Sequence, residues 1–135
     1  MENLHTVTAH IGQEQYRTEL RTTNHLVIAD EGTDVGGADL GFAPTDLLAA
    51  SLAACTAITL RMYAERKGWT IGEIDVKVSV MSEKNGQSLK TIITRELVFE
   101  GEVSEDQRQR LLQIANVCPI HKTLTNPIEV LTALG

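Results

Sequence analysis

Residues 44–67, PTDLLAASLAACTAITLRMYAERK, decide the fold of this chain. Pro44 suits the first turn of a helix, and Thr45 and Asp46 suit its positive end. The fourteen residues after Asp46 carry no charge, and Gly68 follows the segment as a C-terminal cap. The pattern predicts one buried helix that is apolar nearly all round. Its uncharged run is shorter than the roughly twenty residues that cross a membrane.

A helix of this kind is difficult to cover with the rest of one small chain. At 1.5 Å per residue it is about 36 Å long, and a compact chain of 135 residues has a diameter of roughly 37 Å. A second subunit is the simplest cover for its apolar surface. We therefore expect a homodimer.

The segments on either side of the helix predict an α+β fold in a single domain, residues 1–135. Alternation of apolar and polar residues indicates strands, Asn85-Gly86 is a strong hairpin signal, and Ser104 with Gln107 forms a capping box. The expected elements are strands at 7–11, 16–21 and 25–29, a loop at 30–44, the long helix, strands at 74–80 and 89–100, helices at 104–118 and 119–124, and a last strand at 128–130.

Composition narrows the class of function. The net charge is −6 and the pI is near 5.1, which argues against a nucleic-acid or anionic-membrane partner. Gly36 and Gly41 have the spacing of a phosphate-binding loop, but Phe42-Ala43 stand where Lys-Ser/Thr belong. Two cysteines are too few for a secreted disulfide framework, and the first residues show no export signal. We expect a cytoplasmic protein without a bound cofactor.

The two cysteines are the candidates for chemistry. Cys118 and His121 have the spacing of metal ligands, but no second pair accompanies them, so we predict no metal site. Cys55 lies near the middle of the apolar helix. Cys118 precedes Pro119 and so stands at a helix N-cap, where a thiolate is favoured. From the residues alone, these are either two buried structural thiols or a redox pair.

The chain resembles the OsmC/Ohr family of small thiol peroxidases that act on organic hydroperoxides. The resemblance covers nearly the whole chain and is densest in GFAPTDLLAASLAACT, residues 41–56, and in VCPIHKTL, residues 117–124. It implies an intertwined homodimer with the active site at the interface. It also implies that Cys55 attacks the hydroperoxide, that Cys118 resolves it as a disulfide, and that a dithiol reductant recycles the protein.

The sequence departs from the family pattern at two positions. Thr45 stands where the peroxidases carry a glutamate, with Asp46 beside it, and residues 22–43 contain no arginine to stabilise the thiolate. Arg17 and Arg21 are the remaining candidates for that cation before the helix, and we expect Asp46 to orient it. The departure keeps a second function open, an OsmC-like small-molecule-binding or stress-related protein without peroxidase activity.

Overall fold

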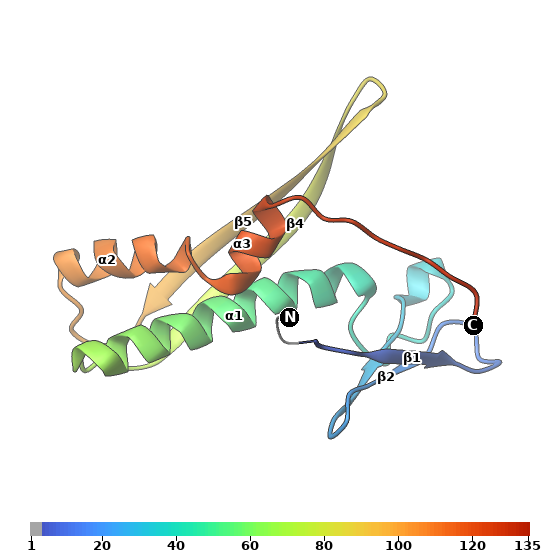
Figure 1. Ribbon diagram of the computed structural model, residues 1–135, viewed down its shortest axis with the longest axis horizontal. Coiled ribbons are helices and arrows are strands. Elements are labelled where there is room, and N and C mark those ends of the chain that lie inside the picture. Colours follow the sequence, from blue (N-terminus) through green and yellow to red (C-terminus); the bar gives the residue numbers. More distant parts are fainter. Residues whose placement is uncertain (1–3) are drawn as a thin grey trace. The chain divides into compact units, whose positions relative to one another are not determined.

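The computed structural model describes residues 4–135 and confirms the α+β class, because antiparallel strands combine with α-helices (Figure 1). Residues 1–3 of the predicted domain lie outside the described part. The elements are β1 (Thr8–Ile11), β2 (Thr18–Arg21), β3 (Leu26–Ala29), a short 3₁₀ helix η1 (Thr33–Val35), α1 (Pro44–Lys67), β4 (Ile74–Asn85), β5 (Ser88–Phe99), α2 (Glu105–Ala115) and α3 (Pro119–Thr125). Contacts divide the chain into two compact units, residues 1–48 and 49–135. The assignment of residues 1–135 to one domain stays a prediction.

The first unit holds the expected antiparallel meander, with strand order β1-β2-β3. The glycine-rich loop that follows folds around Asp30. The Asp30 carboxylate accepts hydrogen bonds from the backbone N–H groups of Glu31 and Leu40, at 2.8 and 3.2 Å. Two of the backbone donors that a glycine loop would offer a phosphate are thus directed to a carboxylate of the chain itself, and those of Gly36 and Gly37 go to backbone carbonyls.

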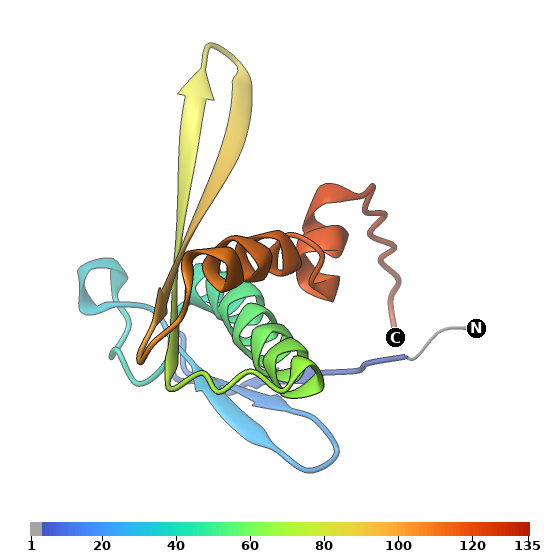
Figure 2. The ribbon, with the colours of Figure 1, turned by 90° about the vertical axis from the view of Figure 1, so that its left-hand side faces the viewer.

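The second unit contains the predicted hairpin and helices. Strands β4 and β5 pair antiparallel from Ile74↔Phe99 to Asn85↔Ser88. Gly86 in the connecting turn has a φ of 67°, which glycine adopts without strain. Ser104 caps α2 with the expected capping box, since its hydroxyl accepts from the Gln107 N–H at 3.1 Å. Figure 2 shows α1 and α2 on the same side of the hairpin.

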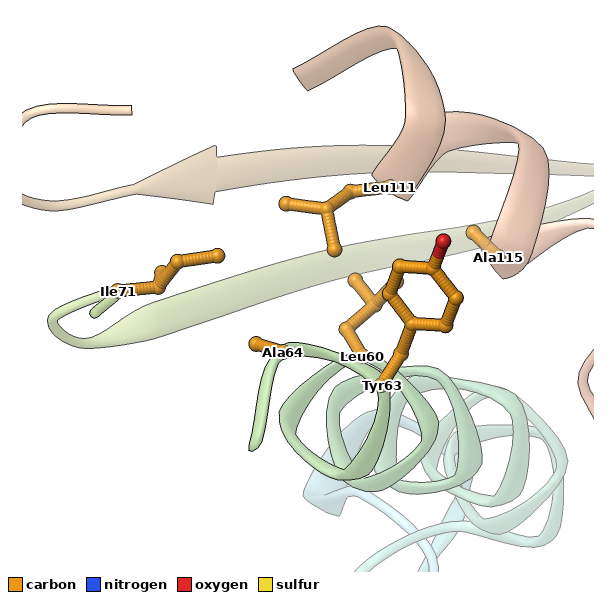
Figure 3. Close-up of a cluster of buried hydrophobic side chains, with 6 residues drawn as sticks. All are labelled: Leu60, Tyr63, Ala64, Ile71, Leu111 and Ala115. Atoms are coloured by element: carbon orange, nitrogen blue, oxygen red, sulfur yellow. The ribbon is translucent and has the colours of Figure 1, made fainter. Parts of the chain in front are cut away.

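The core of the second unit lies where α1 and α2 meet the hairpin (Figure 3). Leu60 and Leu111 are completely buried and face each other across the two helices. The cluster comprises Leu60, Tyr63, Ala64, Ile71, Leu111 and Ala115. Tyr63 keeps its hydroxyl paired, because it accepts a hydrogen bond from Arg110 Nε at 2.9 Å. One stripe of α1 is therefore fixed against α2 and the sheet.

Another side of α1 carries apolar residues that the single chain leaves exposed. Ile58 is 56% exposed and Met62 is 63% exposed. The uncharged run alone is shorter than a membrane span, but the whole helix is long and apolar enough to cross a membrane. The core helix of a soluble protein meets the same criteria of length and composition.

The expected strand at residues 128–130 is not formed, and this expectation was wrong. Residues 127–135 have no regular secondary structure. A strand needs a neighbour for its backbone hydrogen bonds, and within residues 4–135 this segment pairs with no strand. Its apolar side chains are exposed, with Ile128 at 63% and Val130 at 81%.

Candidate active site

Cys118 is held at the start of α3, where Pro119 occupies the first helical position. Its side chain is completely buried. The sulfur accepts a hydrogen bond from the backbone N–H of His121, at 3.3 Å between His121 N and Cys118 Sγ. Cys118 therefore has the N-cap position that its sequence context predicts.

Cys55 lies beside Cys118, although 62 residues separate them in sequence. Both thiols are free, and the Cys55 side chain is near enough to lower the pKa of Cys118. Cys55 is partly exposed on α1, whereas its neighbour Thr56 is buried. The Thr56 hydroxyl oxygen lies 3.9 Å from Cys118 Sγ. The structure thus brings together one accessible sulfur and one buried sulfur.

Arg95 is the cation of this site. It lies on β5 between Ile93 and Leu97, on the face of the strand that packs inward. Its guanidinium donates to the Thr56 hydroxyl oxygen at 3.1 Å and to the Asn116 side-chain oxygen at 3.0 Å. It also lies 3.0 Å from His121 Nδ1. Because arginine has no acceptor, Nδ1 must accept this hydrogen bond, so the neutral ring carries its proton on Nε2.

These contacts decide the ionisation of Cys118. Burial raises the pKa of its thiol, but the opposing contacts outweigh burial and the net pKa is lowered from 9.0. The hydrogen bond from the His121 N–H comes first among them, followed by the neighbouring Cys55 and Thr56 side chains and by the charge of Arg95. The site therefore makes the buried sulfur easier to deprotonate than an ordinary thiol.

We expect Arg95→Gln to raise the pKa of Cys118, because the substitution removes the nearby positive charge. The thiolate absorbance in the ultraviolet should then rise at higher pH than in the wild type. A lowered thiol pKa stabilises the folded protein above the unfolded value of 9.0, and this stabilisation is lost as pH falls through the folded value. Arg95→Gln should reduce that pH-dependent gain. Arg108→Gln, an exposed arginine on α2, should leave the titration unchanged.

The other predicted site residues make contacts of their own. Arg17 and Arg21 both lie against Glu19 in the first unit, with Nη–Oε distances of 3.4 and 3.0 Å. Asp46 accepts a hydrogen bond from the Ala43 N–H at 3.0 Å, which caps the first turn of α1. Their roles as the cation for Cys55 and as its orienting acid stay predictions.

The capping contact gives a direct test of Asp46. Asp46→Ala should lower the free energy of unfolding by about 1 kcal/mol, the usual worth of a helix cap. Asp46→Asn retains an oxygen acceptor and should lose less. Denaturant unfolding measures both variants. An Asp46→Ala variant of wild-type stability that fails to consume peroxide would contradict the capping role and support the orienting one.

The site combines two thiols, the Arg95 cation and neutral hydrogen-bond acceptors, and this set of groups suits thiol redox chemistry. Residues 4–135 contain no group of three or more His, Cys, Asp or Glu side chains placed to hold a metal ion.

Three residues of this site were not predicted from the sequence: Arg95, Thr56 and Asn116. Arg95 had a detectable signal, because a charged residue occupies an apolar position in the alternation of β5.

Comparisons with known proteins agree with the fold. The family model described as "OsmC-like protein" matches residues 36–132. An organic hydroperoxide resistance protein from Elizabethkingia anophelis, with thiocyanate bound, is 24% identical with a TM-score of 0.70, covering 96% of this chain and 94% of its own. A putative osmotic stress induced and detoxification response protein from Psychrobacter arcticus is 23% identical with a TM-score of 0.75, covering 91% and 90%. An OsmC-like protein of unknown function from Vibrio cholerae is 12% identical with a TM-score of 0.75, covering 92% and 95%. No match was found among curated proteins.

Proposed function

The chain belongs to the OsmC-like family, and we propose that it reduces organic hydroperoxides with Cys55 and Cys118. The observation that carries this proposal is the proximity of two free thiols, one of which has a lowered pKa. Several proteins of the same fold are described as organic hydroperoxide resistance proteins. We infer that the reaction takes place in the cytoplasm, where thiols stay reduced.

The difference in exposure supports Cys55 as the attacking sulfur. A peroxide can reach Cys55, which is partly exposed, while Cys118 is 0% exposed. In this mechanism the Cys118 thiolate takes the proton of the Cys55 thiol, so the charge moves to the accessible sulfur. The lowered pKa of Cys118 and the attack by Cys55 are then two parts of one mechanism.

The reaction balances in two steps. The Cys55 thiolate attacks the hydroperoxide, the O–O bond breaks, and the alkoxide takes the proton from Cys118 to leave as an alcohol. Cys55 is now a sulfenic acid. The Cys118 thiolate attacks that sulfur and displaces hydroxide, which takes a proton from solvent to give water. Two electrons pass from the two thiols to the peroxide, and a disulfide remains.

A dithiol reductant completes the cycle by thiol–disulfide exchange. Its thiolate attacks the accessible Cys55 sulfur, and Cys118 leaves. The lowered pKa of Cys118 favours this direction, because a thiol of lower pKa is the better leaving group. A bound cofactor has no step in this scheme.

The second candidate function is small-molecule binding without peroxide reduction. Thr45 at the family's glutamate position and the lack of arginine in residues 22–43 favour it. Arg95 weighs against it, because this residue supplies a cation to the thiol pair from β5. A peroxide-consumption assay with a dithiol reductant, on the wild type and on Cys55→Ser, separates the two functions.

We also propose that the protein is a homodimer with the active site at its interface. The exposed face of α1 and the exposed apolar residues of the C-terminal segment both support a second subunit as their cover. Val130 and Leu131 are 81% and 84% exposed, and a strand from the partner would supply the backbone hydrogen bonds that this segment lacks.

A further inference from the structure

A cavity of about 260 Å³ lies between α1, β5 and α3. Neither cysteine lines it, but it shares Arg95 and His121 with the thiol site. It has room for about nine water molecules at about 30 Å³ each, slightly less than common ligand pockets. The residues that line it are Leu52, Thr91, Ile93, Arg95, His121, Leu124 and Thr125. Three of its seven lining residues, Leu52, Ile93 and Leu124, are aliphatic, so part of its wall suits a compact apolar body.

Arg95 is the only side chain with a permanent charge in this lining, and no carboxylate offsets it. The ion pairs of residues 4–135 join Arg17 and Arg21 to Glu19 instead. Arg95 contacts three neutral acceptors, on Thr56, Asn116 and His121. A partly buried cation without an acidic partner gains from an anion that enters beside it.

The guanidinium also has donors to spare. Its five N–H groups form a planar fork, and the three contacts use one hydrogen of Nη1 and two of Nη2. One hydrogen of Nη1 and the N–H of Nε have no role in them. These two donors lie on opposite edges of the guanidinium, because Nη1 is on the Cδ side and the Nε hydrogen points to the Nη2 side, so each can donate a single charge-assisted hydrogen bond to a carboxylate.

We propose that this cavity is the substrate site and that Arg95 selects hydroperoxides with a carboxylate on a compact apolar body. The proposal rests on the proposed function and adds the substrate class to it. The aliphatic side chains of Leu52, Ile93 and Leu124 hold the body, and Arg95 holds the carboxylate. Arg95 also supports the Cys118 thiolate, so loss of activity on its substitution is no test by itself.

The test compares two substrates that differ in charge and by one methyl group, cumene hydroperoxide with a para carboxylate and the methyl ester of the same compound. In the wild type, kcat/KM for the acid should exceed that for the ester about tenfold, the worth of one charge-assisted hydrogen bond. Arg95→Gln should bring the ratio close to one, whatever its effect on overall rate. Arg108→Gln should keep the wild-type ratio.

Binding without turnover separates this inference from the proposed function. In the Cys55→Ser variant, calorimetry should show para-isopropylbenzoate binding about tenfold more tightly than its methyl ester. Leu124→Phe reduces the space in the cavity, so it should weaken the binding of both ligands and leave the ratio of their affinities unchanged. This variant tests the cavity as the binding site if Arg95→Gln fails to fold. If the acid binds but the wild type consumes no hydroperoxide, the anion site is upheld and the peroxidase is overturned. Equal kcat/KM for acid and ester would overturn the selection by Arg95 and leave the peroxidase intact.

Discussion

Cys55→Ser should abolish the consumption of organic hydroperoxides, while Cys118→Ser should react once and stop. The first variant lacks the sulfur that a peroxide can reach. The second keeps it but lacks the thiol that closes the disulfide. Cys118→Ser should therefore accumulate a sulfenic acid on Cys55, which a dimedone-type reagent traps and mass spectrometry locates.

Controls make this result specific to the thiols. Thr59→Ala lies one turn from Cys55 on the same stripe of α1 and should keep wild-type activity. Stoichiometric peroxide added to the wild type, followed by non-reducing peptide mapping, should recover a Cys55–Cys118 link. A single turnover in Cys55→Ser but not in Cys118→Ser would reverse the two roles. No reaction in the wild type would replace the peroxidase with the binding function.

The long helix and the hairpin were predictable because local signals agree with the final structure there. Residues 44–67 combine Pro at the start, an uncharged interior and Gly68 at the end, and α1 begins and ends at those residues. Asn85-Gly86 connects the strands that it indicates. The last strand was not predictable in this way, since alternation near residue 130 reveals an apolar segment but not whether a neighbour exists to pair with it.

The candidate site was predictable in its sulfurs but not in its cation. Both cysteines stand in distinctive local contexts, and Cys118 occupies its predicted N-cap. The family pattern places an arginine before the helix, so it predicted Arg17 or Arg21 as the cation. Arg95 comes from a strand 39 residues after Thr56, and only the tertiary fold brings the two side chains together. A charged residue in the apolar register of an amphipathic strand is the signal that would have found it.

In solution the protein should have about twice the mass of its 14.8 kDa chain, as measured by light scattering at micromolar concentration. The prediction follows from the apolar side of α1, which one chain leaves exposed at Ile58 and Met62. Interfaces of this obligate kind are large and resemble a domain core cut in half. A wild-type monomer that stays folded on dilution would contradict it, and with it an active site shared between subunits.

Met62→Glu tests the face of α1 directly. In a symmetric dimer one substitution places two carboxylates in the interface, and burying an unpaired charge costs on the order of 3 kcal/mol or more each. Since about 1.4 kcal/mol corresponds to a tenfold change, the dimer dissociation constant should rise by on the order of 10⁴-fold. Leu112→Glu makes the same change at a 49%-exposed position on α2 and should leave the mass at that of the dimer. If Met62→Glu stays dimeric while Leu112→Glu dissociates, the subunits meet through α2, and the exposed side of α1 must be covered in another way.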